Sequence, residues 1–459
     1  MSDLRWRLIQ SSTASGVNLM ARMAEQLLLV PILLGAWSVE LFGEWVLLAA
    51  IPTYFLLSDL GFVTSGSNEL ARRSELESED SVRDFFADYT ASFMRWSVLV
   101  FAVIVALAWL VPFHGWLGIE KLSETQTNLV FTLLVADALV SMNGLALLAG
   151  LRARRLLHVG LLLRAGSSIA ILSLVMIGVT WFDAGPVEAA AIQVCVRLVE
   201  FAVHLVILKR QRLTVPFSPL HRNREPMRPF VITGLEYMLF PMGEAMLLQG
   251  MTLLVGVFTT PVVVAAFATH RTLSRLTAQV LLVAVNPVRA EAGLMQGEAN
   301  RHELARVVIS ASRLTLWASL ILVAILLAFG GWIFATWTHG RVSFDAALLA
   351  VLACATVIEG VWRVPSSVRL GTNRHRPLAT GFLFSSLLGL ASAAVLVFPA
   401  GIVGMAWGMV IAQLAMCLIT IPLTTPLIGM GNAAYLRAVA HPPLGELRAG
   451  WRMIRSRIG

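Results

Sequence analysis

Long apolar runs recur along the whole chain and leave room for little else. They lie at about 15–37, 42–66, 85–111, 124–149, 157–182 and 187–208, and after a polar stretch at about 230–258, 261–288, 305–335, 345–369, 378–399 and 401–427. A helix of roughly twenty apolar residues spans the hydrocarbon core of a bilayer. The runs therefore predict an all-α, polytopic membrane protein with about twelve transmembrane helices. The composition is typical of that class, since 57% of the 459 residues are hydrophobic and 14% are charged.

Positively charged residues gather in alternate loops. They cluster at 72–83, 152–155, 209–228, 289–306 and 374–376, whereas the opposite loops hold Lys121 and Arg341. By the positive-inside rule, both termini and the central polar stretch are expected on the cytoplasmic side. The first apolar run contains Arg22 and Glu25 and lacks a clear small-residue cleavage site. It is interpreted as a retained span and not as a cleaved signal peptide.

The two halves of the chain share features at matching positions. The fourth and tenth spans end at Gly150 and Gly371, and each carries an acid about three turns earlier, Asp137 and Glu359. A polar, proline-containing stretch lies at the midpoint. We therefore expect two parallel six-helix lobes around a central cavity, as in many transporters. The predicted parts are an N-lobe (1–208), a cytoplasmic linker (209–229), a C-lobe (230–429) and a basic cytoplasmic tail (430–459).

In the tail, apolar residues recur every three or four positions from Leu444 to Ile458, with Arg448, Arg452 and Arg455 between them. This pattern predicts an amphipathic helix on the anionic cytoplasmic leaflet. A solvated basic tail is the alternative.

Arginines inside the predicted spans are the candidates for substrate binding, because an ionised group at membrane depth must face protein or water. Arg22 lies on one helical face with Glu25. Arg271 and Arg275 are one turn apart near mid-span, with no acid within a turn on their own helix. Two such guanidinium groups need acids from other helices or an anionic ligand, and their forks suit phosphate oxygens. A substrate-anion site and a structural ion-pair network with Glu236 or Glu244 are both open.

The embedded acids are the candidates for ion coupling. Burial favours the protonated form of a carboxylate, which a proton or cation carrier requires, but each acid can instead neutralise an arginine. Three pairs can be satisfied on their own helices: Arg22 with Glu25, Arg197 with Glu200, and Glu359 with Arg363. The coupling-ion candidates are Glu25, Asp59, Asp137, Glu236, Glu244 and Glu359.

Other polar groups in the spans are expected to be structural. Asp88, Arg95, Arg164 and Arg313 lie near the cytoplasmic halves of their helices, where arginine often snorkels to the interface. His204 and His270 are interpreted as packing residues. Asn143 follows Asp137 on the fourth span and has no assigned role.

Local motifs resemble those of a known family. The first is Pro31-Ile32-Leu33-Leu34-Gly35, after a polar opening to the first helix. The others are Glu40-Leu41-Phe42-Gly43-Glu44-Trp45, Leu57-Ser58-Asp59-Leu60-Gly61-Phe62 and Asn68-Glu69-Leu70-Ala71, with the turns at Gly150 and Gly371. With two parallel six-helix lobes, they resemble the multidrug/oligosaccharidyl-lipid/polysaccharide exporter superfamily, and within it the Wzx-type O-antigen and capsule flippases.

The resemblance implies a flippase of the bacterial inner membrane. Its partner would be an undecaprenyl-pyrophosphate-linked oligosaccharide, moved by alternating access through a V-shaped cavity for cell-surface polysaccharide biosynthesis. A proton or sodium gradient would drive it, and other polysaccharide assembly proteins would be candidate partners besides membrane lipids. Arg22, Arg271 and Arg275 would hold the pyrophosphate or acidic sugars, and Asp59 and Glu25 would be coupling candidates.

Two other functions compete with this one. A cation-coupled multidrug antiporter of the same fold would favour acids and aromatic residues in its cavity, where this chain has arginines. A membrane-embedded polysaccharide polymerase would need a large outward loop, and the longest here are 113–123 and 335–344. No nucleotide-binding or nucleophile motif appears, so an enzyme and a nucleic-acid partner are not expected. Cys195, Cys354 and Cys417 stand alone, and neither a metal nor a cofactor is predicted.

Overall fold

A computed structural model describes residues 2–57, 61–217, 221, 223–294, 301–372, 376–443 and 445 of the chain. Every regular element among these residues is a helix. Nine helical segments of this described part are long and apolar enough to cross a membrane. One of them, α14 (Arg376–Thr424), is two helices that meet at Ala400 and Gly401. If α14 is divided there, and α11 and the pair α2–α3 are added, the number of spans equals the twelve predicted.

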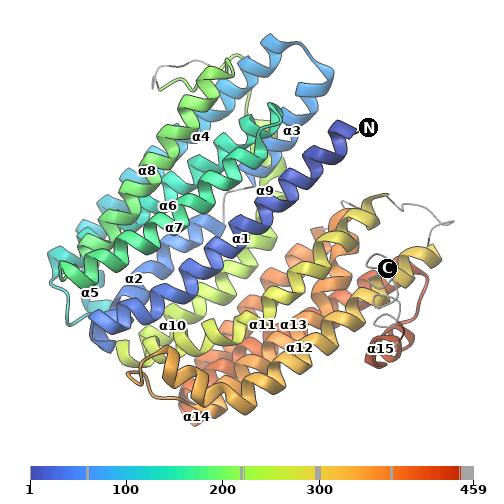
Figure 1. Cartoon of the computed structure of the whole chain (residues 1–459). Coiled ribbons are helices and arrows are strands. Elements are labelled where there is room, and N and C mark those ends of the chain that lie inside the picture. Colours follow the sequence, from blue (N-terminus) through green and yellow to red (C-terminus); the bar gives the residue numbers. More distant parts are fainter. Residues whose placement is uncertain are drawn as a thin grey trace, which may run out of the picture. The chain divides into compact units, whose positions relative to one another are not determined.

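The chain forms two compact units. Unit 1 comprises residues 1–245 and 259–265, and unit 2 comprises residues 246–258 and 266–459. The elements of unit 1 are α1 (Ser2–Ala36), α2 (Val39–Leu57), α3 (Phe62–Leu76), α4 (Glu79–Leu110), α5 (Phe113–Trp116), α6 (Glu124–Ala153), α7 (Leu157–Trp181), α8 (Pro186–Arg210) and α9 (Arg228–Ala245). Within this unit, α1 packs along α7 and α6 packs along α8 (Figure 1).

Unit 2 begins inside a membrane span. It starts with a π-helix (Met246–Gly250) and α10 (Met251–Phe258). It then contains most of α11 (Pro261–Leu294), α12 (Arg301–Trp337), α13 (Ala346–Gly371), α14, a 3-10 turn (Thr425–Ile428) and α15 (Asn432–Ala440). The division into units thus falls within the helical run 228–258, and the predicted lobe boundaries stay a prediction.

One helix at the centre of each unit is far more buried than its neighbours. In α6 and α13, 56% and 61% of the apolar stretch is buried, whereas in α4 and α8 the value is 17%. These two central helices are the fourth and tenth predicted spans, which end at Gly150 and Gly371. The two helices thus have similar burial, and the match between their acids, Asp137 and Glu359, stays a prediction.

The second predicted span, 42–66, is not one helix. It consists of α2 and α3, and Gly61 precedes α3 with φ of 59°. A Cβ atom at Gly61 would lie 1.9 Å from the carbonyl oxygen of Gly234 in α9. Glycine is therefore needed here for its backbone conformation and for the close approach of α9. Asp59 lies outside the described residues.

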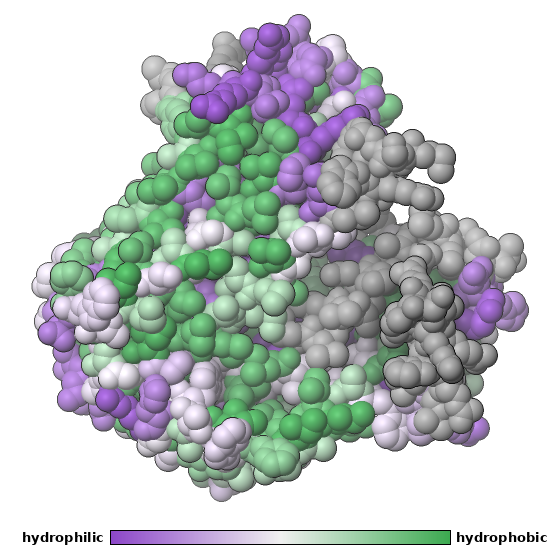
Figure 2. Space-filling view, in the orientation of Figure 1, coloured by the Kyte–Doolittle hydropathy of each residue, from purple (hydrophilic) through white to green (hydrophobic). Residues whose placement is uncertain are grey.

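The two ends of the spans differ in polarity. Figure 2 shows hydrophobic side chains over the middle of the helices and hydrophilic ones around the α3–α4 connection. At that end, Arg72 bonds Glu69 and Glu77, and its hydrogen bond lowers the pKa of Glu69 to about 2. Near the other end, Trp109 and Trp181 are 52% and 78% exposed, as is typical of a membrane interface.

The predicted linker is bound to unit 1 by a cluster that we call the linker clamp: Asp88, Arg95, His221, Asn223 and Glu225. Asp88, 1% exposed, accepts hydrogen bonds from the backbone N–H groups of Arg224 and Glu225, and His221 Nε2 lies 2.8 Å from it. Arg95 donates to the His221 carbonyl at 2.8 Å and to Asn223 Oδ1 at 2.6 Å. Asp88 and Arg95 therefore hold protein groups, which supports the expectation that they are structural, although Arg95 binds the linker and does not snorkel.

We expect Asp88→Asn to loosen the linker clamp, because an amide replaces a buried carboxylate that accepts three hydrogen bonds. Hydrogen bonds to a charged group contribute about 1.5–3 kcal/mol, so the variant should unfold at lower temperature and expose the linker to protease. The control is Asp84→Asn, one turn away, because Asp84 forms an exposed ion pair with Arg224. Such pairs contribute about 0–1 kcal/mol. Equal behaviour of the two variants would contradict the clamp.

Candidate functional site

Unit 1 holds a group of charges inside the helix bundle, which we call the unit 1 charge cluster. Glu25 comes from α1, Asp137 from α6, Arg164 from α7, and Arg197 and Glu200 from α8. Arg197 and Glu200 lie one turn apart, so both point from α8 toward α6 and α7. The four helices pack against each other in two pairs, α1 with α7 and α6 with α8, and so bring the charges together.

Glu200 is the centre of this cluster. It is 5% exposed, and its carboxylate lies 3.0 Å from Arg197 Nη1 and 3.5 Å from Arg164 Nη1. Arg164 also donates to Ser141 Oγ at 3.3 Å. Arg164 is 8% exposed and bound within the unit, so the prediction that it snorkels is wrong. The pairing of Arg197 with Glu200 on one helix is as predicted.

Asp137 is held less closely. Its Oδ1 lies 3.7 Å from Arg197 Nε, and neither atom has a hydrogen-bond partner among the described residues. Glu25 is half-buried and faces Ser168 and Arg197, while Arg22 lies exposed on α1. The cluster thus contains three carboxylates and two guanidinium groups, the buried one of Arg164 and the half-buried one of Arg197, with Arg22 at its margin. The ion pair with Arg197 is thus the contact that holds the Asp137 side chain.

In unit 2, Arg271 of α11 is bound by neutral groups. Its Nη1 donates to the backbone carbonyl of Leu248 and, at 2.7 Å, to Thr252 Oγ1. Leu248 lies in the π-helix, where the altered helical repeat changes the usual backbone pairing. The Arg271 guanidinium also lies 5.6 Å from the centre of the Phe267 ring. Within the described residues, no carboxylate is placed on Arg271, and the charged group that faces it is Arg275.

Arg275, one turn further along α11, has an acid close by. Its Nη1 lies 3.7 Å from Glu359 Oε2 of α13, and Arg363 Nε lies 3.5 Å from Glu359 Oε1. The two guanidinium groups therefore share the Glu359 carboxylate. Glu359 is 4% exposed. The predicted Glu359–Arg363 pair is present, and Glu359 joins Arg275, which sequence spacing could not indicate. Of the other predicted partners, Glu244 is half-buried in unit 1, and the side chain of Glu236 lies outside the described part.

Two further predicted residues have structural partners. His270 Nδ1 lies 2.7 Å from the carbonyl oxygen of Ala266, and Nε2 accepts the N–H of Asp345. The ring packs beside Phe334 and Phe344, which supports its interpretation as a packing residue. Arg313 donates to the Ala438 carbonyl in α15, and does not snorkel as predicted. Residues 446–459, which carry most of the predicted amphipathic tail, lie outside the described residues.

Thr252 and the Leu248 carbonyl are functional candidates that sequence reasoning did not identify. Thr252 is 1% exposed and its hydroxyl also lies 3.1 Å from the Leu248 carbonyl, so three groups meet at one point. Pro241 is not a signal for this site, because a proline releases the carbonyl four residues before it, whereas Leu248 lies seven residues after it. The sequence therefore did not indicate that the Leu248 carbonyl is available or that Thr252 and Arg271 reach it.

No protein-family model matches the chain, and no curated protein matches it. Solved structures do resemble it. An inward-facing multidrug resistance MATE family transporter of the MOP superfamily has a TM-score of 0.75 at 15% identity, over 90% of this chain and 98% of that chain. An outward-facing transporter of that description has a TM-score of 0.66 at 14% identity, over 92% and 95%. A MATE structure in the bent conformation has a TM-score of 0.58 at 16% identity, over 94% and 99%.

At these identities the likeness establishes the fold. The chain has the two-lobe, twelve-helix architecture of these transporters, and the predicted fold class is confirmed.

Proposed function

We propose that this chain is a membrane transporter that exports amphiphilic molecules by alternating access, and that its cargo carries a negative charge. The transporter part rests on likeness to structures described as inward-facing and outward-facing. The observation that carries the anionic cargo is Arg271, a guanidinium in a membrane span that is held by a carbonyl and a hydroxyl. An anion would supply the missing counter-charge.

Arg271 and Arg275 would contribute differently to binding of the cargo. Arg271 has no described carboxylate partner, so its charge is available to a ligand, whereas the charge of Arg275 is partly satisfied by Glu359 at 3.7 Å. The anionic group would pair with Arg271 first and draw Arg275 from Glu359. The apolar part of the cargo would stay in the hydrocarbon phase. Binding would shift the conformational equilibrium by its different affinity for the two states.

The unit 1 charge cluster would supply ion coupling. A proton on Asp137 would remove the attraction between Asp137 and Arg197. Arg197 would then stay paired with Glu200. Na⁺ would require oxygen ligands, of which Glu25, Asp137 and Ser168 are the nearest candidates in this cluster. The coupling role of Asp59, Glu236 and Glu244 remains a proposal from the sequence.

Two cargo classes fit an anionic amphiphile. The solved structures favour drug-like molecules, since they are described as multidrug resistance transporters. The two neighbouring arginines favour a pyrophosphate, as on a lipid-linked oligosaccharide, because guanidinium binds phosphate oxygens with two hydrogen bonds. The polysaccharide flippase is therefore the second candidate, and the multidrug-type exporter the first.

Reconstituted proteoliposomes with an imposed pH or Na⁺ gradient test the proposal. Three probes are compared: a fluorescent organic anion, an organic cation of similar size, and a short-chain prenyl pyrophosphate disaccharide. We expect gradient-dependent movement of the organic anion and little movement of the cation. Preference for the prenyl pyrophosphate would select the second candidate, and movement of the cation alone would overturn the anionic cargo. Movement of none of the three would overturn the transporter proposal.

A further inference from the structure

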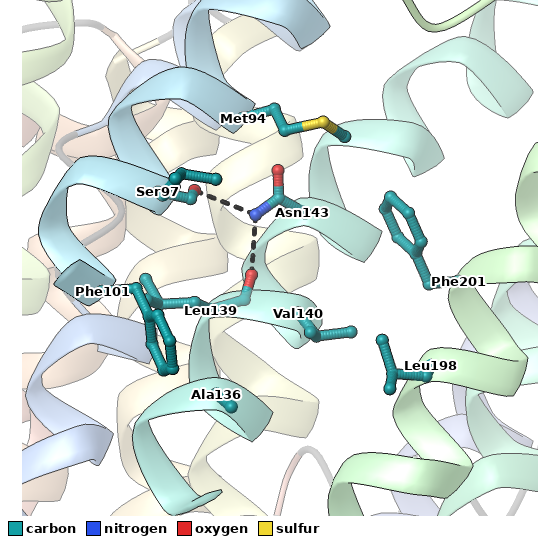
Figure 3. A pocket seen from close by; sticks show the side chains of 10 residues that line it. Met94, Ser97, Phe101, Ala136, Leu139, Val140, Asn143, Leu198 and Phe201 are labelled. Carbon is teal, nitrogen blue, oxygen red and sulfur yellow. Dashed lines mark hydrogen bonds between the residues drawn. The ribbon is translucent and has the colours of Figure 1, made fainter. Parts of the chain in front are cut away.

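A groove lies on unit 1 between α4, α6 and α8, outside the charge cluster. Its volume is about 260 Å³, and its walls are formed by Met94 and Phe101 of α4, Val140 of α6, and Leu198 and Phe201 of α8 (Figure 3). None of the residues that line it is charged. A ligand in this groove would therefore be neutral where it contacts the protein.

The groove opens toward the bilayer. Val98 and Leu198 at its rim are 63% and 48% exposed, and α4 and α8 are among the least buried spans of the unit. In a membrane, exposed apolar residues of a spanning helix contact lipid chains. The molecules that reach the groove are thus those dissolved in the hydrocarbon phase.

A single amide, that of Asn143 on α6, faces this apolar groove. Its Nδ2 donates to Ser97 Oγ at 2.9 Å and to the Leu139 carbonyl at 2.8 Å. Within the described residues, no group donates to Asn143 Oδ1. Figure 3 shows this oxygen turned away from both bonds, on the side of Met94. A polar atom without a partner in hydrocarbon costs free energy, so an acceptor at this place calls for a donor.

Helix packing accounts for the Asn143 side-chain nitrogen and leaves the side-chain oxygen unexplained. The bonds from Nδ2 tie α6 to α4 through Ser97, as polar side chains do between membrane helices. They leave the side-chain oxygen of Asn143 at the groove. A leucine or alanine side chain at this position would cost less free energy. We propose that the groove binds a neutral lipid-phase amphiphile, a hydrocarbon chain with one hydroxyl that donates to Asn143 Oδ1. This site is independent of the proposed cargo and of Arg271.

Photolabelling in nanodiscs tests the site with two probes, a diazirine-bearing hexadecanol and its methyl ether. They share the chain and the acceptor oxygen, and differ in the hydroxyl donor. We expect the alcohol to label residues of α4, α6 and α8 at the groove about fivefold more than the ether, as one hydrogen bond would give. Equal labelling by the two probes would overturn the proposed role of Asn143.

Variants separate binding from packing. Ala136→Phe should fill the groove and reduce labelling by both probes, with Val140→Phe as a second filling variant. Asn143→Leu should keep the shape and lower labelling by the alcohol to the level of the ether. Leu99→Phe, on the exposed face of α4, is the control that should change neither. Undiminished labelling in both filling variants would overturn the site itself.

Discussion

Replacing Arg271 with glutamine should reduce transport of an anionic cargo by about ten- to a hundredfold while leaving the protein folded. The reason is that a charge-assisted hydrogen bond contributes about 1.5–3 kcal/mol, and about 1.4 kcal/mol corresponds to a factor of ten. Glutamine ends two bonds short of the position of Arg271 Nη1, so the hydrogen bonds to Leu248 and Thr252 are lost as well, and their effect on stability is measured separately. Cargo movement in proteoliposomes and thermal unfolding of the same preparation give the two readings.

A matched control for this variant is Arg313→Gln. Arg313 also lies in a span of unit 2, and its guanidinium is also bound by a backbone carbonyl, that of Ala438. If the loss of transport comes from removing a charge near the cargo, Arg313→Gln should transport normally. Arg271→Lys adds a second test, because lysine keeps the charge and lacks the fork that binds a phosphate with two hydrogen bonds. Full transport by Arg271→Gln would remove Arg271 from the cargo site.

The largest effect on stability is expected from Glu200→Gln. This variant would remove the carboxylate that Arg164 and Arg197 share, and Arg197 would keep Asp137 at 3.7 Å. Breaking a buried ion pair by removing one partner costs about 3–5 kcal/mol. We expect a large decrease in thermal stability in detergent, measured by the loss of helical signal or by aggregation on heating.

Two comparisons make this result interpretable. Glu188→Gln lies on the same helix and changes an exposed carboxylate that accepts the N–H of Gly185, so it should have little effect. The double variant Glu200→Gln, Arg164→Gln also removes the arginine charge that Glu200→Gln leaves unpaired. It should therefore recover part of the lost stability. If Glu200→Gln were as stable as Glu188→Gln, the ion pairs of the unit 1 charge cluster would not hold its helices together.

Hydropathy was sufficient to predict the helices, because a membrane span must be apolar over a fixed length. It could not reveal the break at Gly61, which arises from backbone geometry where α9 packs closely, and it could not reveal the π-helix. The unit 1 charge cluster could not be predicted from hydropathy either. Arg197 and Glu200 pair on one helix and could be predicted from spacing, but the contacts of Asp137 and Arg164 depend on which faces of α6, α7 and α8 meet.

The same limit explains the incorrect snorkelling predictions. Position along a helix places Arg95 and Arg164 near the interface, and only the fold shows that the linker and Glu200 reach them first. In α11, spacing placed Arg271 and Arg275 on one face correctly. Their different surroundings, a carbonyl and a hydroxyl for one and a shared carboxylate for the other, come from neighbours distant in the sequence.

The linker clamp bears on how this protein could be engineered. Residues 221 and 223–225 are fastened to α4, so the polar segment between the halves is not a slack tether. A reporter domain or an affinity tag placed there would compete with Asp88 for its backbone partners. The exposed turn at Gln211 and Arg212 comes before the fastened part and is the better insertion point. Separately expressed halves should keep residues 221–245 with the first fragment, because that segment belongs to unit 1.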